Sequence, residues 1–281
     1  MHTKIIVLLA ALLLTLQRGG GGFTQPEPIA FDDHVGWQAI FDGSSLKDWD
    51  GNMDVWRLEN GAIVGTSTPE KPSGTTYIIW KGGEPKNFEL KLEMKLEGPG
   101  LNSGIQYRSA ITPPPQGRSG QNQNPANAKF NLKGYQADFD YLGRYTGQLY
   151  EQGTGRGIIA WRGQVVRTEQ AKRPRLLAML GDPDELKGYI KVNDWNQVHI
   201  IARGNEMIHI VNGHVMSIFI DDDPTMAVAT SGQILTRSWP WTARYTGSRA
   251  ASKKRPTAVA VATNDSLGTS KPSIEAERMP P

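Results

Sequence analysis

The chain has 281 residues and no cysteine, which excludes disulfides, zinc–thiolate sites, iron–sulfur clusters and cysteine nucleophiles. Its net charge of +3 comes from the two ends, because residues 23–230 carry 21 basic and 25 acidic residues. A protein body with a net charge of −4 lacks the concentrated basic surface that binds nucleic acid, and we predict no nucleic-acid partner.

The first 22 residues have the pattern of an export signal. Lys4 precedes an apolar run of twelve residues from Ile5 to Leu16, and Arg18 and four glycines follow. This run suits the apolar region of a secretory signal peptide and is too short to span a bilayer. We therefore predict a signal peptide over residues 1–22 and a linker over residues 23–35. The product would be periplasmic or secreted, with no stable membrane anchor after signal removal.

From residue 36 to residue 235, short β-type runs alternate with turn residues. Asn60-Gly61 and Asn212-Gly213 each stand between two such runs, and each pair predicts a β-hairpin with a type I′ turn. Residues 88–96 alternate apolar and charged side chains, which predicts a strand with one buried face. Helical stretches are few, and we expect one over residues 172–180. The pattern indicates an all-β, antiparallel sandwich.

The strand pattern ends after Gln233-Ile234-Leu235. Pro240 would interrupt a central ladder, and residues 242–281 have the composition of a disordered segment. We therefore expect a basic, disordered tail over residues 236–281. It would be either a natural extension or the product of a shifted reading frame near Leu235.

Polar side chains recur inside the strand predicted around residues 102–108. Strand alternation places Gln106 and Arg108 on one face and Ile105 and Tyr107 on the other. Arg108 would either pair with a carboxylate inside the sandwich or bind a sugar oxygen or a developing enolate, to which its planar fork of donors is suited.

A second polar series occupies the strand predicted around residues 136–140. Gln136, Asp138 and Asp140 alternate with apolar residues and should share one face. They would form either a solvated polar face or part of a site for a hard cation, which takes carboxylate and amide oxygens.

Three further side chains are candidates for proton transfer. Glu151 precedes a glycine-rich loop that would be either a surface turn or the rim of a groove. His199 and His209 lie within well-patterned strands, where a single histidine is more often structural than catalytic. Neither histidine can be assigned from its position alone.

Eight short motifs occur in an order and spacing that point to one family. They are Trp37 with Phe41-Asp42-Gly43, Trp56-Arg57-Leu58-Glu59-Asn60-Gly61, Asn87-Phe88-Glu89-Leu90, Leu101-Asn102-Ser103-Gly104-Ile105-Gln106-Tyr107-Arg108, Lys133-Gly134-Tyr135-Gln136-Ala137-Asp138, Gly147-Gln148-Leu149-Tyr150-Glu151, Asp194-Trp195-Asn196 and His209-Ile210-Val211-Asn212-Gly213. Over about residues 35–220 the chain resembles the bacterial 3-keto-disaccharide hydrolases, also described as 3-keto-glucoside 1,2-lyases and 3-keto-2-hydroxyglucal hydratases.

The resemblance implies a concanavalin A-like jelly roll over residues 36–235 that acts on small 3-oxidised sugars. In such a sugar the C3 carbonyl acidifies the C2 proton, so that elimination of the group on C1 needs a base, donors for the enolate and an acid for the leaving alcohol. Hydration of the product completes a net hydrolysis. The expected catalytic residues are Arg108, Asp138, Glu151 and His209, and the expected substrate-binding residues are Asn102, Gln106, Gln136, Tyr150 and His199.

The family also implies a divalent metal, for which Asp138 and Gln136 are the candidate ligands. Calcium, magnesium, manganese and zinc are not distinguished, and no organic cofactor is expected. The alternative function is a non-catalytic carbohydrate-binding module of the same fold. Convergence of Arg108, Asp138 and Glu151 in one groove would favour the enzyme, and an aromatic-lined groove without them would favour the binding module.

Overall fold

The computed structural model describes residue 31, residues 37–68, 70–98, 102–112, 125–170 and 172–224, and the backbone of three later strands. The proposed signal peptide, the linker apart from Phe31, and the tail apart from those strands lie outside the described residues. The elements are β1 (Gln38–Phe41), β2 (Trp49–Gly51), β3 (Trp56–Glu59), β4 (Ala62–Gly65), β5 (Thr76–Trp80), β6 (Phe88–Leu96), β7 (Asn102–Ile111), the 3-10 helix η1 (Pro125–Phe130), β8 (Leu132–Asp140), β9 (Leu149–Gln152), β10 (Gly157–Ala160), β11 (Gln164–Glu169), β12 (Arg175–Met179), α1 (Pro183–Gly188), β13 (Asn196–Arg203), β14 (Glu206–Val211), β15 (His214–Asp222), β16 (Gln233–Ser238), β17 (Ala243–Thr246) and β18 (Val259–Thr263).

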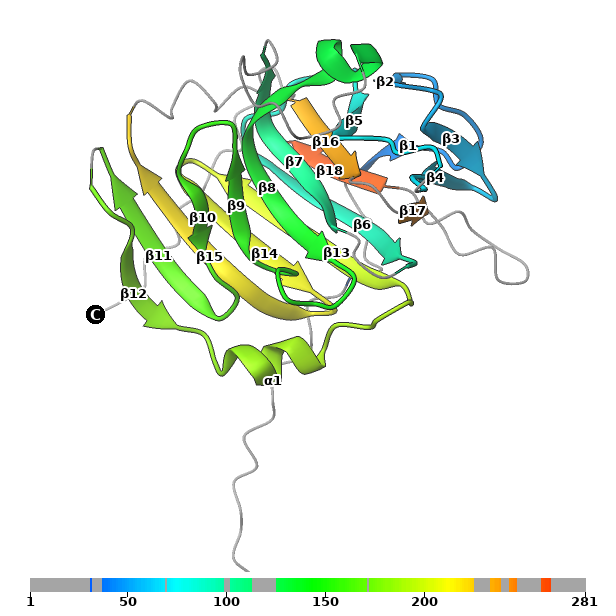
Figure 1. The fold of residues 1–281 in the computed structure, drawn as a ribbon. Coiled ribbons are helices and arrows are strands. Elements are labelled where there is room, and N and C mark those ends of the chain that lie inside the picture. Colours follow the sequence, from blue (N-terminus) through cyan, green and yellow to red (C-terminus); the bar gives the residue numbers. More distant parts are fainter. Residues whose placement is uncertain are drawn as a thin grey trace, which may run out of the picture.

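Two sheets pack face to face, as the sequence predicts for an all-β jelly-roll sandwich (Figure 1). The smaller sheet has the order β10-β9-β8-β7-β16-β5-β2, and the larger one runs from β12 through β11, β15, β14, β13 and β6 to β3. Pairing is antiparallel apart from β11 and β15, which run parallel. Among the described ranges, no helix is long and apolar enough to cross a membrane.

The local sequence signals explain the framework. Asn60 and Gly61 have φ values of 51° and 74°, and Asn212 and Gly213 have φ values of 49° and 82°. Positive φ at both central residues is what a type I′ turn requires, so both predicted hairpins are confirmed. The apolar side chains of β6 point between the sheets, where Leu90 and Met94 are fully buried.

Two sequence predictions about secondary structure are wrong. Residues 172–180 do not form a helix, because Arg175–Met179 is the strand β12, paired with β11. Regular strands do not stop at Leu235, because β16 continues to Ser238 between β7 and β5. In both segments a neighbouring strand supplies hydrogen-bond partners for the backbone N–H and C=O groups, and the local composition does not reveal that strand.

Candidate functional site

A row of carboxamides crosses the outer face of the smaller sheet. Gln106 on β7 pairs with Gln136 on β8, which pairs with Tyr150 on β9. Asp138 follows two residues after Gln136 and therefore lies on the same face, while Ala137 points into the core. We call Gln106, Gln136 and Gln148 the glutamine row.

Hydrogen bonds along the glutamine row converge on Asp138. The Ser109 hydroxyl donates to Gln106 Oε1 at 2.7 Å, and Gln106 Nε2 donates to Gln136 Oε1 at 3.3 Å. The side-chain amides of Gln136 and Gln148 each donate to one carboxylate oxygen of Asp138. Asp138 as a whole is only 6% exposed, and its carboxylate has two fixed donors, so the position and the negative charge of the carboxylate are both held in place.

Gln148 provides an unused acceptor at this position. Its side chain is buried, and its Oε1 has no hydrogen-bond partner among the described atoms. A buried polar atom without a partner is costly, which makes this oxygen a natural place for a ligand hydroxyl to donate. Gly104 leaves space for the side chain of Gln136, because a Cβ at position 104 would lie 2.8 Å from Gln136 Cγ and 2.6 Å from the carbonyl oxygen of Ala137.

Two aromatic side chains stand at the end of the row. The loop after β8 is held by Asp140, whose carboxylate accepts the backbone N–H groups of Arg144, Tyr145 and Thr146 at 2.9, 2.7 and 2.9 Å. The loop brings the Tyr145 ring to 6.3 Å from the ring of Trp161, measured between centroids. Trp161 is 43% exposed and directly follows β10, whose Ala160 pairs with Leu149 next to Gln148.

The Asp140 carboxylate is therefore a loop cap. Asp140 shares the outer face with Gln136 and Asp138, as the alternation predicts, because Phe139 points into the core. Its carboxylate accepts three backbone N–H groups of the loop and thereby fixes the loop beside the row. Arg162 fixes the same loop from the other side by donating to the carbonyl oxygens of Gly143 and Thr146, both at 2.8 Å.

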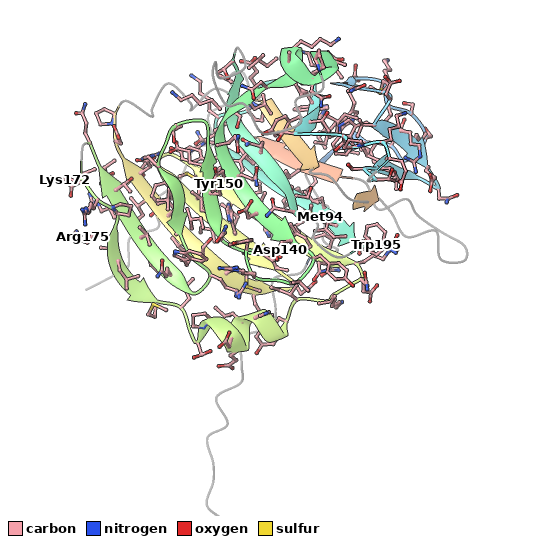
Figure 2. All side chains as sticks on the ribbon, viewed as in Figure 1. Met94, Asp140, Tyr150, Lys172, Arg175 and Trp195 are labelled. Atoms are coloured by element: carbon pink, nitrogen blue, oxygen red, sulfur yellow. The ribbon has the colours of Figure 1, made fainter. Side chains whose placement is uncertain are left out.

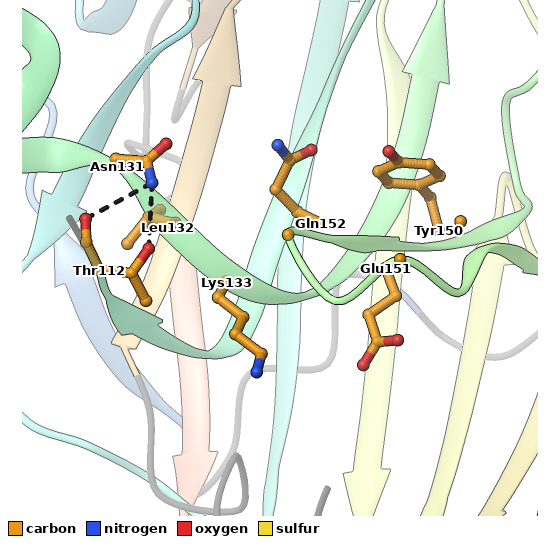
Figure 3. Close-up of a pocket in the computed structure, with 10 residues that line it drawn as sticks. Thr112, Asn131, Leu132, Lys133, Tyr150, Glu151 and Gln152 are labelled. Atoms are coloured by element: carbon orange, nitrogen blue, oxygen red, sulfur yellow. Dashed lines mark hydrogen bonds between the residues drawn. The ribbon is translucent and has the colours of Figure 1, made fainter. Parts of the chain in front are cut away.

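A cavity of about 490 Å³ lies at the other end of β8 and β9 (Figure 3). Tyr150 lines it and is also the cross-strand neighbour of Gln136, so the cavity begins one strand position from the glutamine row. In Figure 3, Tyr150 and Gln152 point to one side of the sheet, and Lys133 and Glu151 point to the other. A volume of this order accommodates a sugar-sized ligand.

Arg108 does not share a face with Gln106, and that prediction is wrong. The pairing of β7 with β8 shifts between Tyr107 and Ala110, and Arg108 has a φ of 46°. Such a bulge adds one residue to the strand and reverses the direction of the side chains beyond it. The guanidinium therefore points between the sheets, where it donates to the carbonyl oxygen of Lys86 at 3.0 and 2.7 Å and to Met207 Sδ at 3.3 Å.

Glu151 also points between the sheets. Its carboxylate is fully buried and pairs with Arg156, which also donates to Asp221 at 2.7 Å. The Tyr135 hydroxyl donates to the same Asp221 oxygen at 2.6 Å. Burial opposes the charge of Asp221, but the hydrogen bonds from Arg156 and Tyr135 lower the pKa of its carboxyl below the ordinary value. Glu151 thus belongs to an internal ion-pair cluster, and its buried carboxylate fits neither of the two positions that the sequence left open, a surface turn or the rim of a groove.

His209 is enclosed between the sheets. Its Nε2 lies 2.8 Å from the Tyr107 hydroxyl, and its Nδ1 lies 3.2 Å from the carbonyl oxygen of Gln148. Burial lowers the pKa of His209 to about 4, so the imidazole is neutral near pH 7. It contacts the backbone behind the glutamine row and has no path to a substrate on the outer face.

The remaining two predicted residues lie away from Asp138. His199 is on the outer face of the larger sheet, where its Nε2 is 3.1 Å from Glu89 Oε2 and its ring meets Trp37 edge-on. It lies on the opposite side of the sandwich from the row, so a contact with the same substrate is excluded by the geometry. Asn102 begins β7 opposite Asp140, close to the row but outside its hydrogen bonds.

The predicted metal ligands do not make a complete cation site. Both Asp138 oxygens already accept amide hydrogen bonds, and no cluster of three or more His, Asp or Glu side chains suited to a metal occurs in the part of the chain that the structure describes. A hard cation usually takes six or more oxygen ligands, several of them charged. These residues do not fit a divalent metal.

Three residues of the site were not predicted from the sequence. Gln148 and Tyr150 are the two neighbours of Leu149, whose side chain lies in the core. The strand alternation that predicts an outward Tyr150 therefore also predicts an outward Gln148. Tyr145 and Trp161 are adjacent only because of the loop that Asp140 and Arg162 hold, and no sequence spacing reports that contact.

Comparison with known proteins agrees with the fold and identifies a family. The sequence model of the 3-keto-alpha-glucoside-1,2-lyase-like domain matches residues 36–245. A search of curated proteins found no match.

Solved structures with similar folds are distant. A carbohydrate-binding module from Bacillus subtilis shares 15% identity, covers 75% of this chain and 92% of its own, and gives a TM-score of 0.42. A Bacillus subtilis protein with a galectin-like fold shares 13% identity, covers 80% and 97%, and gives 0.47. A β-1,3-1,4-glucanase from a mouse hindgut metagenome shares 15%, covers 74% and 94%, and gives 0.39. Likenesses this remote do not bear on function.

Proposed function

This chain belongs to the 3-keto-alpha-glucoside-1,2-lyase-like domain family, and from that premise we propose that it is an exported enzyme that cleaves 3-keto-glycosides. The reaction is an elimination across C1 and C2 followed by hydration, which amounts to hydrolysis. Export rests on the apolar run at residues 5–16, outside the described residues, and cell fractionation of the full-length protein tests it.

The position of Asp138 is the observation that carries the proposal. Its carboxylate is held by the glutamine row, where the side chains of Gln136 and Gln148 fix both of its oxygens on the outer face of the sheet. A general base must be held within hydrogen-bond reach of the proton that it removes, and a rigid sheet supplies that precision better than a loop does.

The chemistry assigns a role to each neighbour. Asp138 removes the proton on C2, the freed electron pair forms the C1–C2 double bond, and the bond from C1 to the glycosidic oxygen breaks. Carboxamide N–H groups of the glutamine row donate to the C3 oxygen, on which negative charge develops. The Tyr150 hydroxyl, on the same face, gives its proton to the departing oxygen.

Hydration then reverses the proton transfers. A water molecule gives one proton to the Tyr150 phenolate, and its hydroxyl group adds to C1. Protonated Asp138 returns its proton to C2. The sugar leaves as the 3-keto-hexose, and both side chains regain their starting states. The cavity beside Tyr150 is the place for the leaving group.

The test compares two aspartates on the same strand. Asp138→Asn should lower kcat on a 3-keto-glucoside by about a hundredfold or more, the usual scale of general-base loss. Asp140→Asn keeps an acceptor for the loop and should stay within about tenfold of wild type. The unoxidised glucoside should not be cleaved, and an EDTA arm tests the metal that the resemblance implies. Undiminished turnover in Asp138→Asn would overturn the role of Asp138.

A second candidate function is a non-catalytic carbohydrate-binding module. It is favoured by one observation: Arg108 and Glu151 point away from Asp138, whereas the rings of Trp161 and Tyr145 contact each other just after β10, whose last residue pairs with the neighbour of Gln148. A binding module would bind the keto sugar and its unoxidised parent, measured by calorimetry, and release product from neither. Release from the keto sugar by the folded protein rejects this alternative.

A further inference from the structure

The bulge in β7 places Ser109 on the same face of the smaller sheet as Gln106. Residues three apart on a regular strand point to opposite faces. In β7, however, Arg108 and Ser109 together stand opposite the single residue Gly134, where the pairing with β8 shifts. Ser109 thereby turns to the outer face, where its hydroxyl donates to Gln106 Oε1 at 2.7 Å. This face is turned toward the viewer in Figure 2, in which the labelled Tyr150 marks β9.

Gly134 on β8 makes room for Ser109 at this bulge. A Cβ at position 134 would lie 2.6 Å from Ser109 Cα and 2.8 Å from the carbonyl oxygen of Arg108, so any other residue would displace backbone. Ser109 itself is only 2% exposed, and its hydroxyl also lies 3.0 Å from the carbonyl oxygen of Tyr107. That oxygen can only accept, so the surroundings of Ser109 call for a donor.

The carboxylate of Asp138 dictates the direction of the hydrogen bonds that lead to it from Ser109. A carboxylate can only accept, so Gln136 presents its Nε2 to Asp138 and therefore its Oε1 to Gln106. Gln106 in turn donates through its Nε2, at 3.3 Å, which leaves its own Oε1 facing Ser109. Only a donor satisfies that oxygen, and the Ser109 hydroxyl is that donor. All three hydrogen bonds therefore point from Ser109 toward Asp138.

We propose that Ser109 is a positioning residue for Asp138 and acts through Gln106 and Gln136. Its hydroxyl holds both carboxamides in the one orientation that presents an N–H group to the carboxylate. Loss of the hydroxyl takes the donor away from Gln106 Oε1, which is completely buried, and turning that carboxamide over would bring its oxygen against Gln136 Oε1. The inference rests on the proposed function, in which Asp138 removes the proton on C2.

Two substitutions of Ser109 in the full-length protein test the donor. Ser109→Ala should lower kcat on a 3-keto-glucoside by about tenfold and leave KM unchanged, because a displaced base slows the chemical step and not binding. Ser109→Thr keeps the hydroxyl and should restore most of kcat. Ser73→Ala is the matched control, because Ser73 is also 2% exposed and its hydroxyl donates to the carbonyl oxygen of Gly74 in the loop before β5. A loss of kcat in Ser109→Ala no larger than in Ser73→Ala, or no recovery in Ser109→Thr, overturns the proposal.

A second variant tests the direction of the hydrogen bonds and leaves Ser109 in place. In Gln106→Glu, a protonated carboxyl group accepts from Ser109 and donates to Gln136 Oε1, as the carboxamide does, whereas a carboxylate can only accept. The kcat of Gln106→Glu relative to wild type should therefore rise by about tenfold as the pH falls from about 8 to about 5. A group that only fills space would show no such pH dependence, and a ratio that does not rise overturns the proposed direction.

A readout besides activity separates failure of this inference from failure of the proposed function. The side-chain amide signal of Gln136 in an NMR spectrum is identified by its loss in Gln136→Met. Its hydrogens should exchange with solvent faster in Ser109→Ala than in wild type, because the hydrogen bonds that hold the carboxamide are weakened. Equal exchange overturns the positioning role of Ser109. Faster exchange together with undiminished turnover in Asp138→Asn supports the hydrogen-bond chain and overturns the proposed role of Asp138 alone.

Discussion

The Nδ1 atom of His209 lies 3.2 Å from the main-chain carbonyl oxygen of Gln148, and through this contact the interior of the sandwich supports the face that carries Asp138. The side chain of the same Gln148 donates to the Asp138 carboxylate. On the other side of the ring, Nε2 lies 2.8 Å from the Tyr107 hydroxyl. Because a carbonyl oxygen can only accept, Nδ1 carries the proton and Nε2 accepts from Tyr107. His209 is therefore a positioning residue, because it contacts the backbone of Gln148, whose side chain holds the proposed base.

Two substitutions of His209 separate its two contacts. Asparagine places an amide donor near the Nδ1 position and keeps the contact with Gln148, whereas glutamine reaches the Nε2 position and keeps the contact with Tyr107. Each leaves one buried group unpaired, at a cost of about 1–3 kcal/mol in unfolding free energy. We expect kcat on a 3-keto-glucoside to fall more in His209→Gln than in His209→Asn, with KM changed little in both. Equal losses of kcat at equal stability would show that His209 only fills the core.

The buried imidazole also makes stability depend on pH. Burial lowers the pKa of His209 from 6.5 to about 4, so between these values the unfolded chain binds a proton that the folded protein does not. Stability is complete above pH 6.5 and falls as pH drops toward 4, by about 3 kcal/mol at about 1.4 kcal/mol per pKa unit. Burial also lowers the pKa of His199, which adds a loss of the same sign.

Urea unfolding at a series of pH values measures this effect. Between pH 6.5 and pH 4, the unfolding free energy of His209→Asn should fall less than that of wild type. The fall that remains is the contribution of His199. The assignment would be contradicted by a variant whose curve runs parallel to that of wild type.

Local sequence rules predicted the parts of the fold that depend on near neighbours. Asn60-Gly61 and Asn212-Gly213 fix their hairpins through positive φ alone, and the alternation of residues 88–96 fixes which face of β6 is buried. The same alternation places Gln136 and Asp138 together on the outer face. These features need no knowledge of the rest of the chain.

The wrong predictions concern residues whose direction or pairing cannot be read from the periodicity of the sequence. One bulged residue in β7 turns Arg108 into the core, although Gln106, two residues earlier, points outward. Glu151 follows Tyr150 in β9 and therefore points to the opposite face, between the sheets. The glycines that follow it predict a loop, and a loop residue has no such alternation. Residues 175–179 contain good helix formers, and pairing with β11 overrides that propensity.

Removal of Arg156 should destabilise the protein strongly. Among the described side chains, Arg156 is the one cation paired with the buried carboxylates of Glu151 and Asp221, so Arg156→Met removes the cationic partner that both carboxylates have there. Breaking a buried ion pair in this way costs about 3–5 kcal/mol. The control is Arg167→Met, which removes a more exposed pair with Asp222 and should cost about 1 kcal/mol or less. Urea unfolding compares the two, and equal losses would show that the internal cluster does not contribute to stability.

Trp161 should contribute to sugar affinity and leave the chemical step unchanged. Its exposed ring follows Ala160, which pairs with Leu149 next to Gln148, and the Tyr145 ring lies 6.3 Å from it between centroids. The Oε1 of Gln148 has no hydrogen-bond partner among the described atoms. A pyranose stacked on the indole would lose that contact in Trp161→Ala, which should weaken binding by about three- to tenfold, the scale of an aromatic contact. Calorimetry with a 3-keto-glucoside and Asp138→Asn protein measures the affinity without turnover. Trp195→Ala provides the control, because that ring packs against Lys95 of the larger sheet, away from the glutamine row. Unchanged affinity in Trp161→Ala, or an equal loss in both variants, would mean that the sugar does not stack on Trp161.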